Sequence, residues 1–184
     1  IFSQLGDRVC FVVFVALIVT NISKVPSLQS WLYVSFTIPA IILTAIAGVF
    51  IDRWSKKWTL IISNIIRGGL ILLLPVLDKS LLGIYAIAFL FFSATQFFVP
   101  AEAACIPMLV KKNQLLTANS LFTTTMMLCL IFGLVIGARL ISFFDLDYVD
   151  LAITSLFILS ALFLLGIKEK GIEPYRNFII SLQR

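Results

Sequence analysis

Long apolar runs separated by short polar stretches dominate this sequence. Six runs approach or exceed the length that a helix needs to cross a bilayer, about 20 residues: 1–22, 31–51, 58–77, 81–99, 121–144 and 149–167. The runs lack the alternation of barrel strands, and in lipid each segment must satisfy its own backbone polar groups. The pattern therefore predicts an all-α membrane protein, a six-transmembrane-helix bundle in which short connections join antiparallel neighbours.

Composition supports the same class of fold. Of the 184 residues, 61% are apolar and 12% are charged, and the mean hydropathy is +1.10. A soluble domain of this size cannot hide that much apolar surface. No linker or low-complexity run divides the chain, and the apolar run at Ile1 has neither a basic leader nor a small-residue cleavage site. We expect one continuous unit that does not open with a secretory signal.

Basic residues gather in alternate connections. If the spans alternate, one face holds Arg53, Lys56, Lys57, Lys111, Lys112, Lys168, Lys170, Arg176 and Arg184. The opposite face holds Lys24, Lys79, Asp78, Asp145, Asp147 and Asp150. Because loops rich in Lys and Arg stay on the cytoplasmic side, we expect the front end, the 52–57 loop and the tail to be cytoplasmic. This sidedness accounts for the net charge of +5, so no nucleic-acid partner is expected.

The residues that usually carry catalysis or bind metal are sparse. The chain has no His, and its cysteines, Cys10, Cys105 and Cys129, are scattered in or beside apolar runs. Zinc and iron sites need clustered thiolates or imidazoles, and serine or cysteine hydrolases need a base beside the nucleophile. We therefore expect no metal, no cofactor and no enzymatic activity.

The most polar interruption lies between the second and third runs. Its distinctive positions are Gly48, Asp52, Arg53, Lys56, Lys57 and Leu60. We expect Asp52 to cap the free N–H groups at the start of the third helix, and Gly48, one turn earlier, to let a neighbouring helix approach. The basic residues can pair with acidic groups or lipid headgroups. An ordinary positive-inside loop is the alternative interpretation.

This register of Gly, Asp, Arg, two Lys and Leu resembles the signature loop between helices two and three of the major facilitator superfamily. Ser55 stands where that family usually has Gly. A second stretch, from Pro100 through Glu102 and Pro107 to Leu121, resembles the end of helix four and the start of helix five in the branch of siderophore exporters and macrolide efflux proteins. The resemblance implies a secondary transporter that exports a small organic or amphipathic compound by alternating access, as proton-coupled multidrug antiporters do, with the charged loop as its cytoplasmic gate.

The same resemblance implies that 1–184 is the amino-terminal half of a twelve-helix protein. The opening Ser3 to Arg8 resembles the middle of helix one in that branch, so about half of this helix is expected to be missing, and 168–184 is expected to start the central cytoplasmic loop. The expected partners are the lipid bilayer of a bacterial inner membrane, a small-molecule substrate and the missing carboxyl-terminal half. A lysophospholipid flippase-type transporter and a non-transporting membrane scaffold are the alternatives.

Charged residues inside the apolar runs are the candidates for transport chemistry, because an ionisable group in hydrocarbon usually faces a pathway or a partner. They are Asp7, Arg8, Arg67 and Glu102. Asp7 is a candidate for reversible protonation, and the alternative is a fixed pair with Arg67. Arg67 can instead bind a substrate anion, and Glu102 can pair with a basic residue of the 52–57 loop in one conformation.

Uncharged polar residues and glycines complete the candidate set. A central cavity is predicted to be lined by Gln4, Thr37, Asn64 and Gln96, with Phe36, Phe92, Phe97 and Phe98 beside them. Gly133 and Gly137 have the small-xxx-small spacing of closely packed membrane helices. Leu134 replaces the proline that antiporters of the superfamily often carry there, so proton coupling is inferred from the resemblance alone.

Overall fold

The structure is a computed structural model that describes residues 1–21, 26–78, 80–144 and 146–166. Every regular element within these ranges is helical. In chain order the elements are α1 (Phe2–Asn21), α2 (Pro26–Arg53), α3 (Lys56–Leu72), α4 (Leu74–Leu77), α5 (Leu81–Leu109), the 3-10 turn η1 (Lys112–Gln114), α6 (Leu115–Phe143) and α7 (Leu146–Leu165). The all-α fold expected from the apolar runs is confirmed.

Five of these helices, α1, α2, α5, α6 and α7, are long and apolar enough to cross a membrane. The third predicted span, 58–77, is not among them, because it is divided into α3 and α4 with a break at Leu73. Pro75 lies in the first turn of α4. Because proline has no backbone N–H, it cannot continue the hydrogen-bond ladder of α3, so the break falls just before it.

Two helices extend beyond their apolar runs. The apolar pattern ends its fourth run at 99 and begins its fifth at 121, whereas α5 continues to Leu109 and α6 begins at Leu115. Pro100 and Pro107 both lie inside α5. Prolines are tolerated in membrane helices because neighbouring groups satisfy the carbonyls that they leave free. The length of an apolar run therefore does not give the length of its helix.

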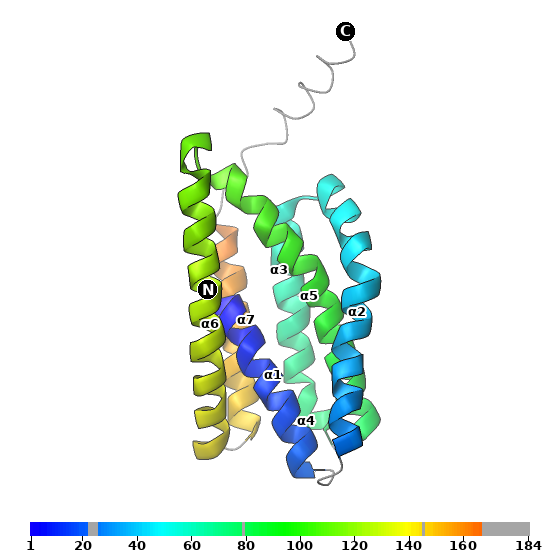
Figure 1. Cartoon of the computed structure of the whole chain (residues 1–184). Coiled ribbons are helices and arrows are strands. Elements are labelled where there is room, and N and C mark those ends of the chain that lie inside the picture. Colours follow the sequence, from blue (N-terminus) through cyan, green and yellow to red (C-terminus); the bar gives the residue numbers. More distant parts are fainter. Residues whose placement is uncertain (22–25, 79, 145, 167–184) are drawn as a thin grey trace.

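The helices pack with α1 and α5 at the centre of one face, α2 and α6 at its sides, and α3 and α7 behind (Figure 1). The main contacts join α2 to α5, α3 to α5 and α7, and α1 to α6 and α7. Phe14, Phe91 and Phe157 are 0% exposed and form the centre of the core. Their ring centroids lie 5.9 Å apart for Phe14 and Phe91, and 5.8 Å apart for Phe91 and Phe157, which is the range of favourable aromatic pairs.

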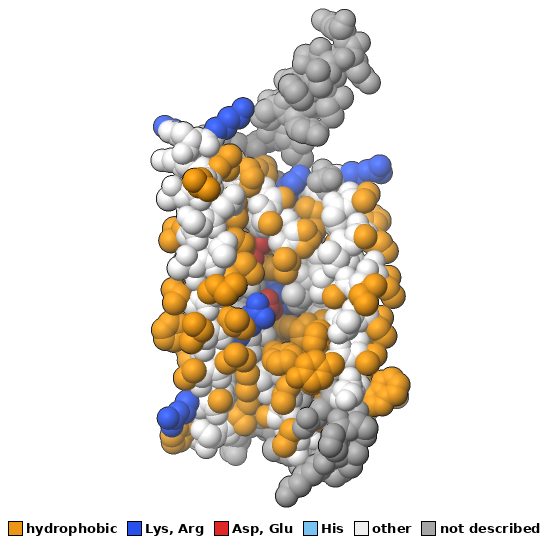
Figure 2. All heavy atoms as spheres, in the orientation of Figure 1, with side chains coloured by type: hydrophobic (Ala, Val, Ile, Leu, Met, Phe, Trp, Pro, Cys, Tyr) orange, Lys and Arg blue, Asp and Glu red, His pale blue; other side chains and the backbone are white. Residues whose placement is uncertain are grey.

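The outer surface is as apolar as the core. Ile41, Leu82 and Leu116 are 74%, 80% and 85% exposed, and many other large apolar side chains are exposed with them. Figure 2 shows hydrophobic side chains over one whole face, basic groups near its two ends, and acidic and basic atoms in a hollow at its middle. Such a surface suits lipid, since soluble proteins rarely expose large apolar patches.

Candidate functional site

Arg67 is the centre of a buried polar network on α3. Its side chain is 0% exposed, and that of Asp7 on α1 is 13% exposed. Nη1 of Arg67 donates to both carboxylate oxygens of Asp7, at 2.7 and 2.9 Å. Hydrogen bonds between two ionised groups are about twice as strong as neutral ones. The fixed pair that the sequence offers as an alternative for Asp7 is therefore the arrangement present in this conformation.

The other donors of the guanidinium are also occupied. Nη2 of Arg67 donates to the Ser3 hydroxyl at 2.8 Å and to the side-chain oxygen of Asn64. Nε donates to the backbone oxygen of Ser63 at 3.3 Å. All five N–H groups of Arg67 thus have acceptors. This geometry favours the ion pair over a role for Arg67 in binding a substrate anion.

Aromatic rings enclose the same guanidinium. Its central carbon lies 4.1 Å from the ring centre of Phe98 and 4.9 Å from that of Phe157, both within cation–π range. Asn64 also donates to the Ser160 hydroxyl at 3.1 Å. The network therefore connects α1, α3, α5 and α7. The sequence pattern did not indicate that Ser3, Ser63 or Ser160 belongs to this network. One-turn spacing could have indicated Ser3, four residues before Asp7, and Ser63, four before Arg67.

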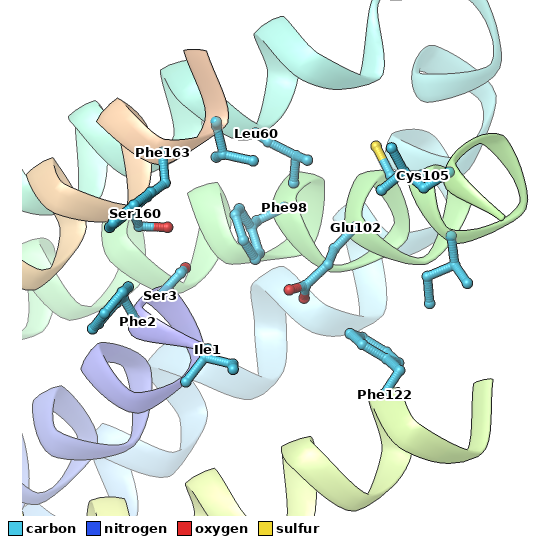
Figure 3. Close-up of a pocket in the computed structure, with 13 residues that line it drawn as sticks. Ile1, Phe2, Ser3, Leu60, Phe98, Glu102, Cys105, Phe122, Ser160 and Phe163 are labelled. Carbon is cyan, nitrogen blue, oxygen red and sulfur yellow. The ribbon is translucent and has the colours of Figure 1, made fainter. Parts of the chain in front are cut away.

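Glu102 on α5 lies in a different environment. One of its carboxylate oxygens accepts a hydrogen bond from the side-chain amide of Gln4 on α1. The carboxylate points into a cavity of about 390 Å³ whose walls include Phe98, Phe122 and Phe163 (Figure 3). A second cavity, of about 260 Å³, also contains Glu102 and Gln4 in its wall. Both cavities are mostly apolar and lie beside Ile1, the first residue of the chain; Leu60 of α3 and three residues of α7 also line the first cavity.

The predicted pair between Glu102 and the basic loop is not formed in this conformation. Across the ranges that the structure describes, the ion pair present is the one between Asp7 and Arg67. Arg53 is exposed, at the end of α2, and Lys56 is the first residue of α3.

The cap of α3 differs from the prediction. The Ser55 hydroxyl accepts from the backbone N–H of Trp58 at 3.3 Å, with Ser55 in an extended conformation, so Ser55 is the N-cap. Asp52 is not the cap because α2 continues through it to Arg53. The side chain of Asp52 lies outside the described part of the structure.

Two further loop residues have defined environments. The Lys57 ammonium donates to the backbone oxygen of Leu165 at 2.7 Å, at the end of α7, where the helix dipole favours a cation. A Cβ added to Gly48 would meet nothing within 4 Å. The expectation that Gly48 admits a neighbouring helix is therefore wrong for the described helices of this chain.

Gly133 and Gly137 lie where α6 crosses α1. A Cβ on Gly133 would lie 2.4 Å from the Cβ of Arg8, and a Cβ on Gly137 would lie 3.1 Å from that of Val12. The first distance is shorter than real Cβ contacts, so only glycine fits there. Both glycines are buried, and the spacing puts the stem of Arg8 directly on the α6 backbone.

The predicted cavity residues have separate environments. Gln4 lines a cavity, whereas Asn64 belongs to the arginine network. The side-chain oxygen of Gln96 accepts from the Thr44 hydroxyl at 2.9 Å and joins α5 to α2. The Thr37 hydroxyl donates to a carbonyl one turn back in its own helix, at 2.7 Å. The side chain of a polar residue in an apolar run can thus form its hydrogen bonds within the bundle without lining a cavity.

Five helices long and apolar enough to cross a membrane, with an ion pair buried among them, identify the class of this chain as a multi-pass membrane protein. Residues 1–177 match the Major Facilitator Superfamily, and the chain belongs to that superfamily. It is 26% identical over 166 residues to "Uncharacterized MFS-type transporter YkuC" of Bacillus subtilis (strain 168). That alignment covers 86% of this chain and 39% of the Bacillus protein, so the chain spans well under half of this relative. No solved structure matches the chain.

Proposed function

We propose that this chain forms one half of a secondary transporter that exports a small organic or amphipathic compound across a bacterial plasma membrane. The observation that carries this proposal is the match of residues 1–177 to the Major Facilitator Superfamily, in a bundle that buries the charged side chains of Asp7, Arg67 and Glu102 partly or fully. Transporters built from two bundles hold their substrate near the midplane, where the bundles meet, and rock about that site. A second six-helix half would complete that site.

The charged connection between α2 and α3 is the proposed cytoplasmic gate. It contains Arg53, Lys56 and Lys57, and further basic residues, Lys111 and Lys112, lie in the connection after α5. The positive-inside rule favours a cytoplasmic location for both connections. A gate needs contacts that exist in only one conformation, and the exposed Arg53 side chain is available for such a contact.

We assign the exchangeable proton of a coupled cycle to Glu102 and give Asp7 a fixed role. Protonation of Asp7 would leave the buried charge of Arg67 unpaired, which costs several kcal/mol. Glu102 receives a hydrogen bond from the neutral amide of Gln4 and faces the cavity. Its charge can therefore change without leaving a buried partner uncompensated.

Transport by the full-length protein in proteoliposomes tests this proposal. A panel of lipophilic dyes, macrolides, siderophores and lysophospholipids is offered with and without an imposed pH gradient. We expect one compound to move, and we expect Glu102→Gln to abolish its gradient-driven accumulation while substrate exchange across the membrane persists. Glu102→Asp, which keeps the carboxylate, is the matched control and should retain gradient-driven transport.

Other outcomes contradict separate parts of the proposal. Gradient-driven accumulation by Glu102→Gln at the wild-type rate would show that the proton is carried elsewhere. Movement of lysophospholipids alone would favour a flippase. If the folded protein moves no compound, the non-transporting scaffold becomes the better interpretation.

A further inference from the structure

The turn between α2 and α3 carries positive charge that the described residues do not neutralise. Residues 52–57 contain three basic residues and one acidic residue, Asp52, which gives a net charge of +2. Lys57 donates to the end of α7, whereas the side chains of Arg53 and Lys56 form no hydrogen bond or ion pair with any residue that the structure describes. Figure 2 shows basic side chains along this end of the bundle. The turn can therefore bind an anion from outside the described residues.

Two tryptophans flank these charges. Trp54 and Trp58 are 51% and 56% exposed, and the Trp54 ring packs against Phe50 with ring centroids 5.1 Å apart. Neither indole N–H donates to a residue within the described ranges. Tryptophan is enriched at the border between lipid tails and headgroups, because its ring is apolar and its N–H can bond to polar groups. The two indoles therefore indicate that this turn lies at the level of the headgroups.

Apolar side chains continue from the turn along the outer faces of both helices. On α2, the exposed Val49 and Phe50 lie four and three residues before Arg53, a spacing that puts all three on one face of the helix. On α3, the exposed Ile62 follows Trp58 by four residues and shares its face. A charged headgroup at the turn would thus have apolar side chains beside its lipid tails.

We propose that this turn binds an anionic phospholipid, with the phosphate at Arg53 and Lys56 and the acyl chains along the outer faces of α2 and α3. An amphiphile with a negative headgroup matches both the charge of the turn and the apolar side chains beside it, whereas a free phosphate ion would use the charge alone. Basic segments next to membrane helices attract anionic lipids in this way. This inference goes beyond the transport function and does not rest on it. Arg53 can hold the lipid in the conformation described here and form the gate contact in another.

The test measures lipid binding to the purified full-length protein in a neutral detergent. Native mass spectrometry gives the dissociation constants of phosphatidylglycerol, which is anionic, and of phosphatidylcholine, which has no net charge. We expect phosphatidylglycerol to bind more tightly to the wild type. A basic residue near an anionic surface contributes about fivefold to affinity, so Arg53→Gln combined with Lys56→Gln should weaken phosphatidylglycerol binding about 25-fold. Binding of phosphatidylcholine should stay unchanged.

Lys111→Gln combined with Lys112→Gln is the matched control. Both lysines are exposed, so this variant removes the same charge from the same end of the bundle. They lie in the connection between α5 and α6, which is apart from the α2–α3 turn (Figure 1). The control should keep the wild-type affinity for phosphatidylglycerol.

Several results would overturn the proposal. Equal affinity of the wild type for the two lipids would do so, as would an equal loss in both double variants, because the whole basic end would then attract the lipid without a site at this turn. Displacement of phosphatidylglycerol by inorganic phosphate would contradict the role of the acyl chains. If Arg53→Gln with Lys56→Gln binds phosphatidylglycerol as the wild type does but melts at a lower temperature, these side chains pair with another part of the protein instead.

Discussion

Replacing Asp7 with Asn removes one charge from the buried ion pair and nearly preserves the volume of the side chain. Arg67 is 0% exposed and Asp7 only 13% exposed, so little water can reach the guanidinium to replace the lost charge. Ser3, Ser63 and Asn64 still accept from Arg67, but none of them is charged. The positive charge then remains buried without a counter-charge.

The expected cost follows from this geometry. Breaking a buried pair by removing one partner costs about 3 to 5 kcal/mol. The lower value, about 3 kcal/mol, applies here because Asp7 is slightly exposed and Asn can still accept one of the two hydrogen bonds. The melting temperature should therefore fall, by less per kcal/mol than in a small domain because the shift shrinks as the protein becomes larger.

The assay is intrinsic tryptophan fluorescence of the purified full-length protein during heating in detergent. Asp78→Asn is the matched control, because Asp78 is only half-buried and forms no ion pair within the described ranges, so its effect should be about 0.5 kcal/mol or less. Asp7→Asn combined with Arg67→Met should be more stable than Asp7→Asn alone, since no buried charge is left. A melting temperature of Asp7→Asn equal to that of the control, or a double variant no more stable than the single one, would refute the reasoning.

Three further changes can be read by the same thermal assay. Gly133→Ala should lower the free energy of unfolding by about 1 to 3 kcal/mol because α1 must move away from α6. Gly69→Ala is the control and should be neutral or slightly stabilising, because its added Cβ meets nothing within 4 Å. Equal effects of the two changes would contradict the close approach of α1 to α6 at Gly133. Ser55→Ala should lower the free energy of unfolding by about 1 kcal/mol because the cap of α3 is lost. Ser55→Asp, which can still cap the helix, should keep most of the wild-type stability. Unchanged stability of Ser55→Ala would rule out the cap. Lys57→Met should lower the free energy of unfolding by about 0.5 kcal/mol, because it removes an exposed hydrogen bond to the end of α7. A loss above about 2 kcal/mol would contradict the view that Lys57 makes only an exposed contact.

The sequence predicted one contact of the site, the pair between Asp7 and Arg67, as the alternative to reversible protonation of Asp7. Few charges lie inside the apolar runs, and a buried charge needs a partner, so Arg67 was a natural candidate for Asp7. Ser3, Ser63 and Ser160 could not be selected in this way because small hydroxyl residues are common in membrane helices and usually bond to their own backbone. Thr37 and Thr125 do so here. The role of Ser55 was missed because the family pattern places Gly there.

The sequence by itself determined that the chain is a membrane-embedded helical bundle, since the thickness of the bilayer dictates the length of each apolar run. It also identified the superfamily, through the short charged connection between α2 and α3. Only the tertiary structure decided which polar groups meet, such as Gln4 with Glu102 and Lys57 with the end of α7. The physical reason is that helices apolar on nearly every side show no periodic face that indicates their neighbour. Their rotation and crossing are set by the packing of many apolar side chains and by close contacts such as that of Gly133 with Arg8.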